Sequence, residues 1–433
     1  MRRILLFIDK EETRDRDIFR PSDYSQDMLK ELHFKGFNSG NKVWLSAVEQ
    51  YLTSDSVDYK YLSKDMDSVF INSSFDLVVF PCANRIRNDN DSKQDLTEWA
   101  NFFDQLVIPV LILGIGAQAK NFEELDSFSK EMKPYLQPFC SAIKKTGGQI
   151  AVRGEFTNNV LKKCGYQDAI TIGCPSLYRN GPDFRIDKKP FTSFKPLLNI
   201  QINDFFQRNI QKEIMSNPEC EAIDQNSFYD LLFDKSSLEK ICMKKHLKFD
   251  EEITKYSYPA LWLLSNNRMH FFYDEPIWKD YLTRNNFTFA YGSRIHGTIM
   301  AILSGVPAAL FNCDSRTKEI AEFFHIPVLE DKKASLVELY QMTDYTSFNE
   351  NYPKKYEAFK NLLFKYGINI SETNIINYRK KTANIDYLYP PSIDPGLAST
   401  LNNKLFKHKG KLFTTNLYKR LYKILKFFRG SKR

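Results

Sequence analysis

The sequence predicts an α/β protein with two sheet-and-helix domains and a binding cleft between them. In the first half, short apolar runs alternate with helical stretches, a pattern typical of a parallel sheet covered by helices. A linker with Gly181, Pro182 and Pro190 separates this series from a second one. The length of 433 residues also favours more than one domain.

The first domain is predicted over residues 1–180. Near-continuous apolar runs at 75–80 and 108–114 are typical of parallel strands that are buried on both faces. Shorter patterns complete this domain: strands at 4–8, 149–153 and 169–173, and helices at 43–52 and 155–163. The linker is placed at 181–194.

The second domain is predicted over residues 195–377 and opens with a strand at 196–202. After a run of helical stretches comes a compact unit: a strand at 287–292, a helix at 294–303, a break at 305–307, a strand at 308–311 and a short helix at 318–324. Ligands of open parallel sheets lie beyond the carboxyl ends of the strands. Functional motifs are therefore expected just after strands.

Residues 378–433 are predicted as a loop followed by a basic tail. The chain has a net charge of +8, yet eleven Lys and Arg residues and no acid lie within 404–433. As a helix the tail is amphipathic, with Leu417, Leu421 and Phe428 on one face, which is typical of a helix that binds an anionic membrane surface. A helix packed on the body and a disordered basic end are the alternatives. Because the folded domains are not basic, we expect no nucleic-acid partner.

The cysteine spacing and the lengths of the apolar runs indicate where in the cell the protein is located. No two of the seven cysteines are closer than ten residues, which excludes a Cys-x-x-Cys redox pair and a zinc knuckle, and we predict no metal site. No run reaches the roughly eighteen apolar residues of a membrane-spanning helix, and the apolar start is too short for a signal peptide. We therefore expect a cytoplasmic protein, held on the inner face of the cell membrane through its tail.

The sharpest local signal is the segment Gly292-Ser293-Arg294-Ile295-His296-Gly297, which follows a predicted strand. Ser293 is well placed as the N-cap of the next helix, so Arg294 and His296 fall in its first turn. Cations there oppose the positive end of the helix dipole, unless that end binds a phosphate or carboxylate. The motif therefore indicates an anion site in which Ser293 also contacts substrate. A surface Arg and a half-buried His are the alternative.

Two motifs of the first domain also follow strands. Gly114 and Gly116 form a pair that lets the backbone approach a ligand closely, although a plain tight turn is the better-supported explanation. Arg153 ends the strand at 149–153 and is a candidate second contact to the anion. A structural ion pair is the alternative role for Arg153.

Two further polar segments are candidate substrate contacts. Asn38 and Asn41 precede a predicted helix, and they either cap it or cradle a polar ligand group at its N-terminus. Arg316 and Lys318 follow the strand at 308–311, and they either share the anion or are solvated loop charges.

Taken in order, these motifs resemble a known family. The segment 292–297, followed by Leu303-Ser304-Gly305-Val306-Pro307 and Asp314-Ser315-Arg316-Thr317-Lys318-Glu319, resembles the polysaccharide pyruvyl transferase family. Four earlier segments fit in the same order: Asn38-Ser39-Gly40-Asn41, Gly114-Ile115-Gly116, Val152-Arg153-Gly154-Glu155 and Gly173-Cys174-Pro175-Ser176. The matching blocks run from residue 36 to 330.

The resemblance implies a GT-B-like fold of two facing Rossmann-like domains. It implies transfer of a pyruvyl group from phosphoenolpyruvate to two hydroxyls of a sugar as a cyclic ketal, in surface polysaccharide biosynthesis. The donor is then phosphoenolpyruvate, the acceptor is a glycan or lipid-linked oligosaccharide, and no further cofactor is expected.

The basic site residues of the family carry over to Arg153, Arg294 and His296. Arg153 and Arg294 would bind the two anionic groups of the donor, with Lys318 as a third cation, and His296 would be the general acid/base. Many relatives have Asp at the position of Lys42 and Gly-Asp-Pro where this chain has Gly-Cys-Pro at 173–175. A nucleotide-sugar glycosyltransferase of the same architecture and a non-catalytic membrane scaffold are the alternative functions.

Overall fold

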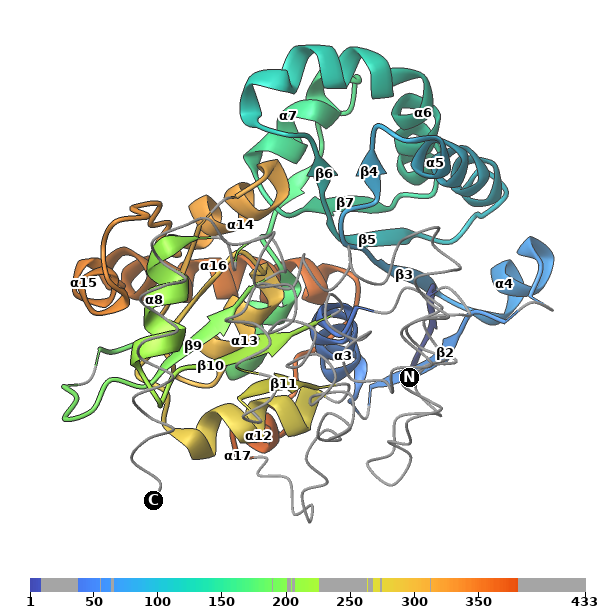
Figure 1. The fold of residues 1–433 in the computed structure, drawn as a ribbon. Coiled ribbons are helices and arrows are strands. Elements are labelled where there is room, and N and C mark those ends of the chain that lie inside the picture. Colours follow the sequence, from blue (N-terminus) through green and yellow to red (C-terminus); the bar gives the residue numbers. More distant parts are fainter. Residues whose placement is uncertain are drawn as a thin grey trace, which may run out of the picture.

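The computed structural model describes residues 1–8, 38–54, 56–63, 66–188, 190–200, 204, 207–225, 263, 268–272, 275–311 and 313–380. The predicted basic helix at 404–433 lies outside these residues. Within them the chain forms two parallel sheets with helices packed around them, as Figure 1 shows. The predicted α/β class is therefore confirmed.

The first sheet has six parallel strands in the order β2-β1-β3-β5-β7-β8. Their bounds are β1 (Arg2–Leu6), β2 (Val57–Tyr61), β3 (Leu77–Pro81), β5 (Val110–Ile115), β7 (Gln149–Val152) and β8 (Ile170–Thr171). Two short strands, β4 (Ile86–Arg87) and β6 (Ala117–Gln118), pair with each other. The predicted strands of the first domain are thus present, and β2 was not predicted.

Helices lie on both faces of this sheet: α3 (Gly40–Leu52), α4 (Ser68–Ser74), α5 (Asn90–Phe103), α6 (Leu125–Lys145) and α7 (Glu155–Lys163), with 3-10 turns η2 (Phe122–Glu124) and η3 (Pro175–Asn180). One face packs Val78 and Ile112 against apolar residues of α5, α6 and α7. The other face packs Leu111 against Trp44 and Val48 of α3. This alternation is what a strand buried on both sides requires.

The second sheet has five parallel strands in the order β11-β10-β9-β12-β13. They are β9 (Pro196–Asn199), β10 (Glu221–Asp224), β11 (Met269–Phe271), β12 (Phe289–Gly292) and β13 (Ala308–Leu310). The helices with them are α8 (Arg208–Ser216), α12 (Glu275–Asn285), α13 (Ile295–Leu303), α14 (Ser315–Phe324), α15 (Leu336–Met342), α16 (Thr346–Lys365) and α17 (Glu372–Lys380). The strand order reverses between β9 and β12, so ligands are expected beyond the carboxyl ends of these two strands.

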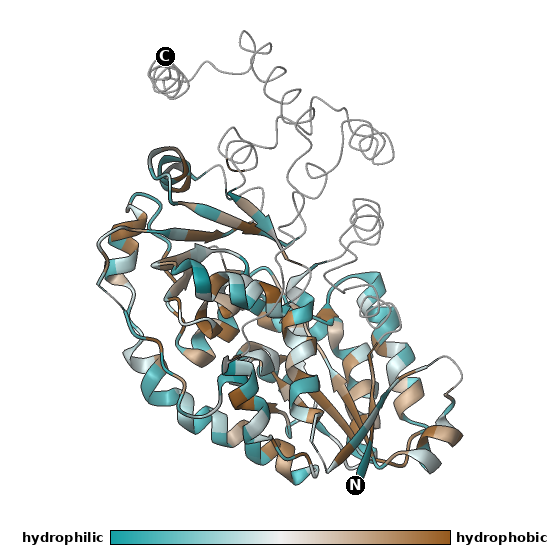
Figure 2. Cartoon of the chain, turned by 90° about the horizontal axis from the view of Figure 1, so that it is seen from below, coloured by the Kyte–Doolittle hydropathy of each residue, from teal (hydrophilic) through white to brown (hydrophobic). Residues whose placement is uncertain are grey.

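The two halves share one hydrophobic core. The α3 side of the first sheet is continuous with buried residues of the second half, including Leu197, Ile299 and Leu310. In Figure 1 α3 lies between the two sheets, and in Figure 2 the strands of the sheets are largely hydrophobic while the helices carry hydrophilic outer faces. Within the described residues, no helix is long and apolar enough to cross a membrane. The shared core brings the carboxyl end of β7 near that of β12.

Candidate functional site

The helix α13 begins at the point where the strand order of the second sheet reverses. Its N-cap residue, Arg294, follows β12, and the Arg294 N–H donates to the carbonyl of Asn199 at the end of β9 (3.1 Å). The first turn of α13 therefore lies at the position where parallel α/β sheets bind their ligands.

The first turn of α13 has open hydrogen-bond donors. Neither Arg294 nor any other side chain caps the helix, and the N–H groups of Ile295, His296 and Gly297 have no hydrogen-bond partner among the described residues. The prediction that Ser293 is the N-cap was wrong, because the helix begins at Ile295 and its N-cap is Arg294. The Ser293 hydroxyl donates to the Asp204 carboxylate. A helix end with free N–H groups carries a partial positive charge and is suited to an anion.

His296 lies buried in this turn and is uncharged at neutral pH. Its side chain is only 7% exposed and its Nε2 atom has no hydrogen-bond partner. Burial lowers the pKa of His296 well below its usual range, and the nearby Arg153, Arg316 and Arg294 lower it further. The structure thus brings four of the predicted site residues together, from both halves of the chain. We call Arg153, Arg294, His296 and Arg316 the basic cluster.

Arg153 is the cluster member from the first half. It is 0% exposed, and its guanidinium donates to the carbonyls of Gly114 (Nε, 2.6 Å) and Cys82 (Nη2, 3.0 Å). A Cβ on Gly116 would lie 3.2 Å from the Arg153 Cδ atom. The predicted glycine pair therefore packs around Arg153. Burial lowers the pKa of Arg153, the nearby Arg316 lowers it further, and Glu319 opposes this shift without outweighing it.

Arg316 is placed by the docking of α14 on the first half. The Ser315 hydroxyl accepts from the Ala119 N–H (2.8 Å) and donates to the Ala117 carbonyl (3.1 Å). Arg316 Nη2 reaches Asp314 at 3.4 Å, while its buried Nε atom has no partner. The guanidinium of Arg316 thus retains hydrogen-bonding capacity toward the cluster.

The N-terminus of α3 lies against His296. Asn38 precedes the N-cap residue Ser39, and its Oδ1 atom accepts from the Gly40 N–H (2.9 Å), while Asn41 accepts weakly from the Trp44 indole (3.5 Å). A Cβ on Gly40 would lie 3.1 Å from the His296 Cβ atom. Where the sequence predicted an open cleft, this close approach leaves the His296 side chain buried.

Comparison with known proteins identifies the family. The model of the polysaccharide pyruvyl transferase family matches residues 11–315, which include Arg153, Arg294 and His296. The chain belongs to this family. The resemblance seen in the sequence motifs is therefore confirmed for most of the chain.

Other comparisons describe more distant proteins. A search of curated proteins gives no match. Similar solved structures include an uncharacterised protein of Klebsiella pneumoniae (13% identity, TM-score 0.36, 74% of this chain and 95% of that one). They also include a UDP-N-acetylglucosamine 2-epimerase (10%, 0.39, 85% and 96%) and the calicheamicin glycosyltransferase CalG4 (11%, 0.29, 88% and 99%). Because these TM-scores are below 0.5, we draw no conclusion about this member of the pyruvyl transferase family from the similarity.

The structure does not bring Lys318 to the basic cluster. Its side chain is 48% exposed, and its ammonium lies 3.9 Å from Glu322 Oε1 and 4.8 Å from the centre of the Phe122 ring. Lys318 follows Arg316 by two residues on α14, so the two side chains leave the helix in different directions. The third arginine near His296 is therefore Arg316 and not Lys318.

Sequence reasoning missed polar residues that surround the cluster. Asn199 is fully buried, and neither side-chain amide atom has a partner, while the Ser39 hydroxyl is likewise buried without one. Glu319 and Thr157 join the two halves beside Arg153. The end of the strand at 196–202 was a signal for Asn199, but no local pattern marks a contact between residues 157 and 319.

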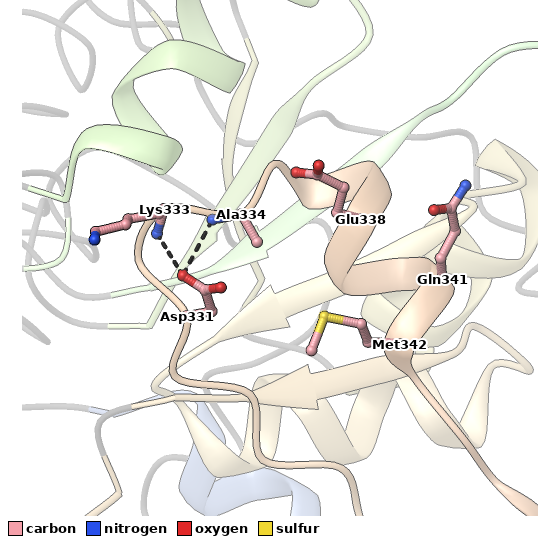
Figure 3. Close-up of a pocket in the computed structure, with 6 residues that line it drawn as sticks. All are labelled: Asp331, Lys333, Ala334, Glu338, Gln341 and Met342. Carbon is pink, nitrogen blue, oxygen red and sulfur yellow. Dashed lines mark hydrogen bonds between the residues drawn. The ribbon is translucent and has the colours of Figure 1, made fainter.

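A surface hollow near α15 is a different kind of feature. It is lined by Asp331, Lys333, Ala334, Glu338, Gln341 and Met342 (Figure 3). Asp331 accepts from the N–H groups of Lys333 and Ala334, and Glu338 forms a capping box with Ser335 at the start of α15. These carboxylates serve the local backbone, so the basic cluster is the stronger candidate site.

Proposed function

We propose that this protein transfers a pyruvyl group from phosphoenolpyruvate to two hydroxyls of a glycan sugar, forming a cyclic ketal and releasing phosphate. The observation that carries the proposal is the basic cluster at the open N-terminus of α13. It combines three arginines, a neutral histidine and three N–H groups without partners among the described residues, and all of these except Arg316 lie within the family match.

The charge of the donor complements the site. Phosphoenolpyruvate carries a carboxylate and a phosphate, and arginine binds both groups through paired hydrogen bonds. Cations brought together in a buried site repel one another, and each is costly to remove from water. An anion bound between Arg153, Arg294 and Arg316 would relieve both costs. This relief favours a dianionic ligand over a neutral sugar at this position.

The neutral state of His296 is suited to the proton transfers of the reaction. One sugar hydroxyl adds to C2 of phosphoenolpyruvate while the C3 methylene gains a proton, so the number of protons is unchanged. His296 accepts the hydroxyl proton and returns it to C3. The C2–O bond to phosphate then breaks, the second hydroxyl adds to C2, and its proton leaves with the phosphate.

The acceptor and the location of the protein are part of the same proposal. A lipid-linked oligosaccharide at the inner face of the cell membrane would be reached through the basic tail at 404–433, which binds anionic lipid surfaces. In this proposal the tail attaches the protein to the membrane, and the basic cluster binds the donor and supports the reaction.

Calorimetric titration with phosphoenolpyruvate tests the proposal. Wild-type protein should bind phosphoenolpyruvate, and Arg294→Ala should bind it about 10- to 30-fold more weakly, because a charge-assisted contact is lost. Arg87→Ala should bind normally, because Arg87 pairs with Asp89. UDP-glucose and UDP-galactose are titrated in parallel. Binding of a UDP-sugar without binding of phosphoenolpyruvate would reject the proposal in favour of a nucleotide-sugar glycosyltransferase.

A further inference from the structure

Glu319 joins the two halves of the molecule next to the basic cluster. It lies on α14 and is only 1% exposed. Its Oε2 atom accepts from the Thr157 N–H (2.9 Å), and its Oε1 atom accepts from the Thr157 hydroxyl (2.8 Å). A carboxylate from the second half thus caps the first turn of α7 in the first half.

The local backbone is shaped to receive this carboxylate. The N-cap of α7 is Gly154, which has no side chain to cap the helix, and a Cβ there would lie 2.4 Å from the Glu319 Cβ atom. A Cβ on Gly116 would lie 3.3 Å from Glu319 Oε1. Any larger residue at Gly154 would push α14 away, so the glycine allows the close contact.

The contact fixes the two sides of the basic cluster relative to each other. Arg153 directly precedes Gly154, and Arg316 lies one turn before Glu319 on α14. The Thr157 hydroxyl also accepts from the Ala117 N–H (2.8 Å), which ties in the loop that holds the Arg153 guanidinium. A shift of α14 relative to α7 would therefore change the spacing between Arg153 and Arg316.

We propose that Glu319 is a positioning residue, which through Thr157 holds Arg153 and Arg316 at the spacing that the anionic donor requires. This role rests on the proposed function, because the required spacing is that of the two anionic groups of phosphoenolpyruvate. Glu319 forms no salt bridge among the described residues, although Arg153 lies close enough to lower its pKa. Burial and the neighbouring Asp314 raise that pKa, to about 8 overall. Burying a carboxyl group is costly, and the paired hydrogen bonds to Thr157 indicate that this group has a specific role in the contact.

Two variants weaken the contact and replace no ionisable group by a neutral one. Glu319→Asp retains a carboxyl group but is one methylene too short to reach both donors of Thr157, and Thr157→Val removes the hydroxyl bond and keeps the N–H bond. Thr157→Ser, which keeps the hydroxyl, and Glu322→Asp, at an exposed position one turn along α14, are the matched controls.

The dissociation constant of phosphoenolpyruvate is measured by calorimetry on the full chain, at a temperature where circular dichroism shows each variant folded. We expect it to rise on the order of tenfold in Glu319→Asp and Thr157→Val, and to be unchanged in both controls. A loss of global stability alone would not move this constant. If wild type binds phosphoenolpyruvate and both variants bind it equally well, the proposal is wrong.

Amide hydrogen exchange of residues 155–160 provides a second readout that does not need the donor. Exchange should be faster in Glu319→Asp than in Glu322→Asp, since the Thr157 N–H loses its acceptor. If wild type does not bind phosphoenolpyruvate, the proposed function fails. The exchange measurement alone then tests whether Glu319 stabilises the first turn of α7. Unchanged exchange in Glu319→Asp would then overturn the positioning role as well.

Discussion

Two buried arginines, Arg179 and Arg153, show what distinguishes a structural cation from a ligand-binding one. Arg179 pairs with Glu275 (Nη1–Oε2, 2.9 Å), donates to Gln50 and Ser46, and stacks on the Tyr378 ring at 3.9 Å. Burial lowers the pKa of Arg179, but Glu275 and Tyr378 outweigh it, so the pKa is raised. The charge of Arg179 is compensated within the protein.

Arg153 is equally buried but is not compensated in this way. Its guanidinium donates to two backbone carbonyls, and no salt bridge of the described residues includes it. Its pKa is lowered, mainly by burial and also by Arg316, and the nearby Glu319 does not outweigh them. Arg179 thus joins η3, α12 and α17. The different surroundings of Arg153 are what the proposed anion site requires.

The largest expected effect is on stability. Arg179→Met leaves Glu275 buried without its cation, so the free energy of unfolding should fall by about 3–5 kcal/mol. Arg153→Met leaves only two carbonyls without a donor and removes a costly buried charge, so the loss should stay below about 2 kcal/mol. Urea denaturation followed by circular dichroism measures both. Equal losses would remove the distinction between the two arginines.

The next effect is on turnover. His296→Ala should lower kcat by about a hundredfold or more, because the proton relay between the hydroxyl and C3 is lost. The dissociation constant of phosphoenolpyruvate should change little, since His296 is neutral in the free protein. Phosphate release at saturating donor measures kcat. An unchanged kcat would exclude His296 as the general acid/base.

Arg294→Ala should act in the opposite sense. Loss of a charge-assisted contact weakens donor binding by about 10- to 30-fold, so KM for phosphoenolpyruvate rises while kcat at saturation changes less. Initial-rate kinetics separates the two constants. A fall in kcat with an unchanged KM would move Arg294 from donor binding to the chemical step.

The smallest effect is the pH dependence of stability. Because the pKa of His296 is lowered in the folded state, the unfolded chain binds more protons at acidic pH. Stability should therefore fall as pH drops below about 6.5, by at most about 1.4 kcal/mol per pH unit from this group. His296→Gln should flatten this slope in urea titrations between pH 5 and 7. A slope identical to that of wild type would show that His296 does not titrate in this way.

Much of the fold was predictable from local patterns. The apolar runs at 75–80 and 108–114 became β3 and β5, because a strand buried on both faces leaves a continuous apolar signature. The motif around Arg294 and His296 was found because it directly follows such a strand. Both patterns lie within short segments of the sequence, so they can be recognised without knowledge of the tertiary structure.

The rest depends on contacts between distant residues. The Ser293 hydroxyl was expected to cap α13, but the helix begins one residue later than expected, and the hydroxyl donates to the distant Asp204. The pairs Glu319–Thr157 and Arg179–Glu275 join residues that are far apart in the chain, and each residue alone reads as an ordinary helix or loop position. Whether an arginine is structural or functional is set by such partners, which a single sequence does not display.

Thermal unfolding of wild type and Arg153→Met, each with and without phosphoenolpyruvate, tests the central claim most directly. A ligand that binds only the folded state raises Tm. We predict that phosphoenolpyruvate raises the Tm of wild type and leaves that of Arg153→Met unchanged, although the two proteins unfold at similar temperatures without it. The same ligand-induced increase in both proteins would contradict the account, because Arg153 would then not hold the donor.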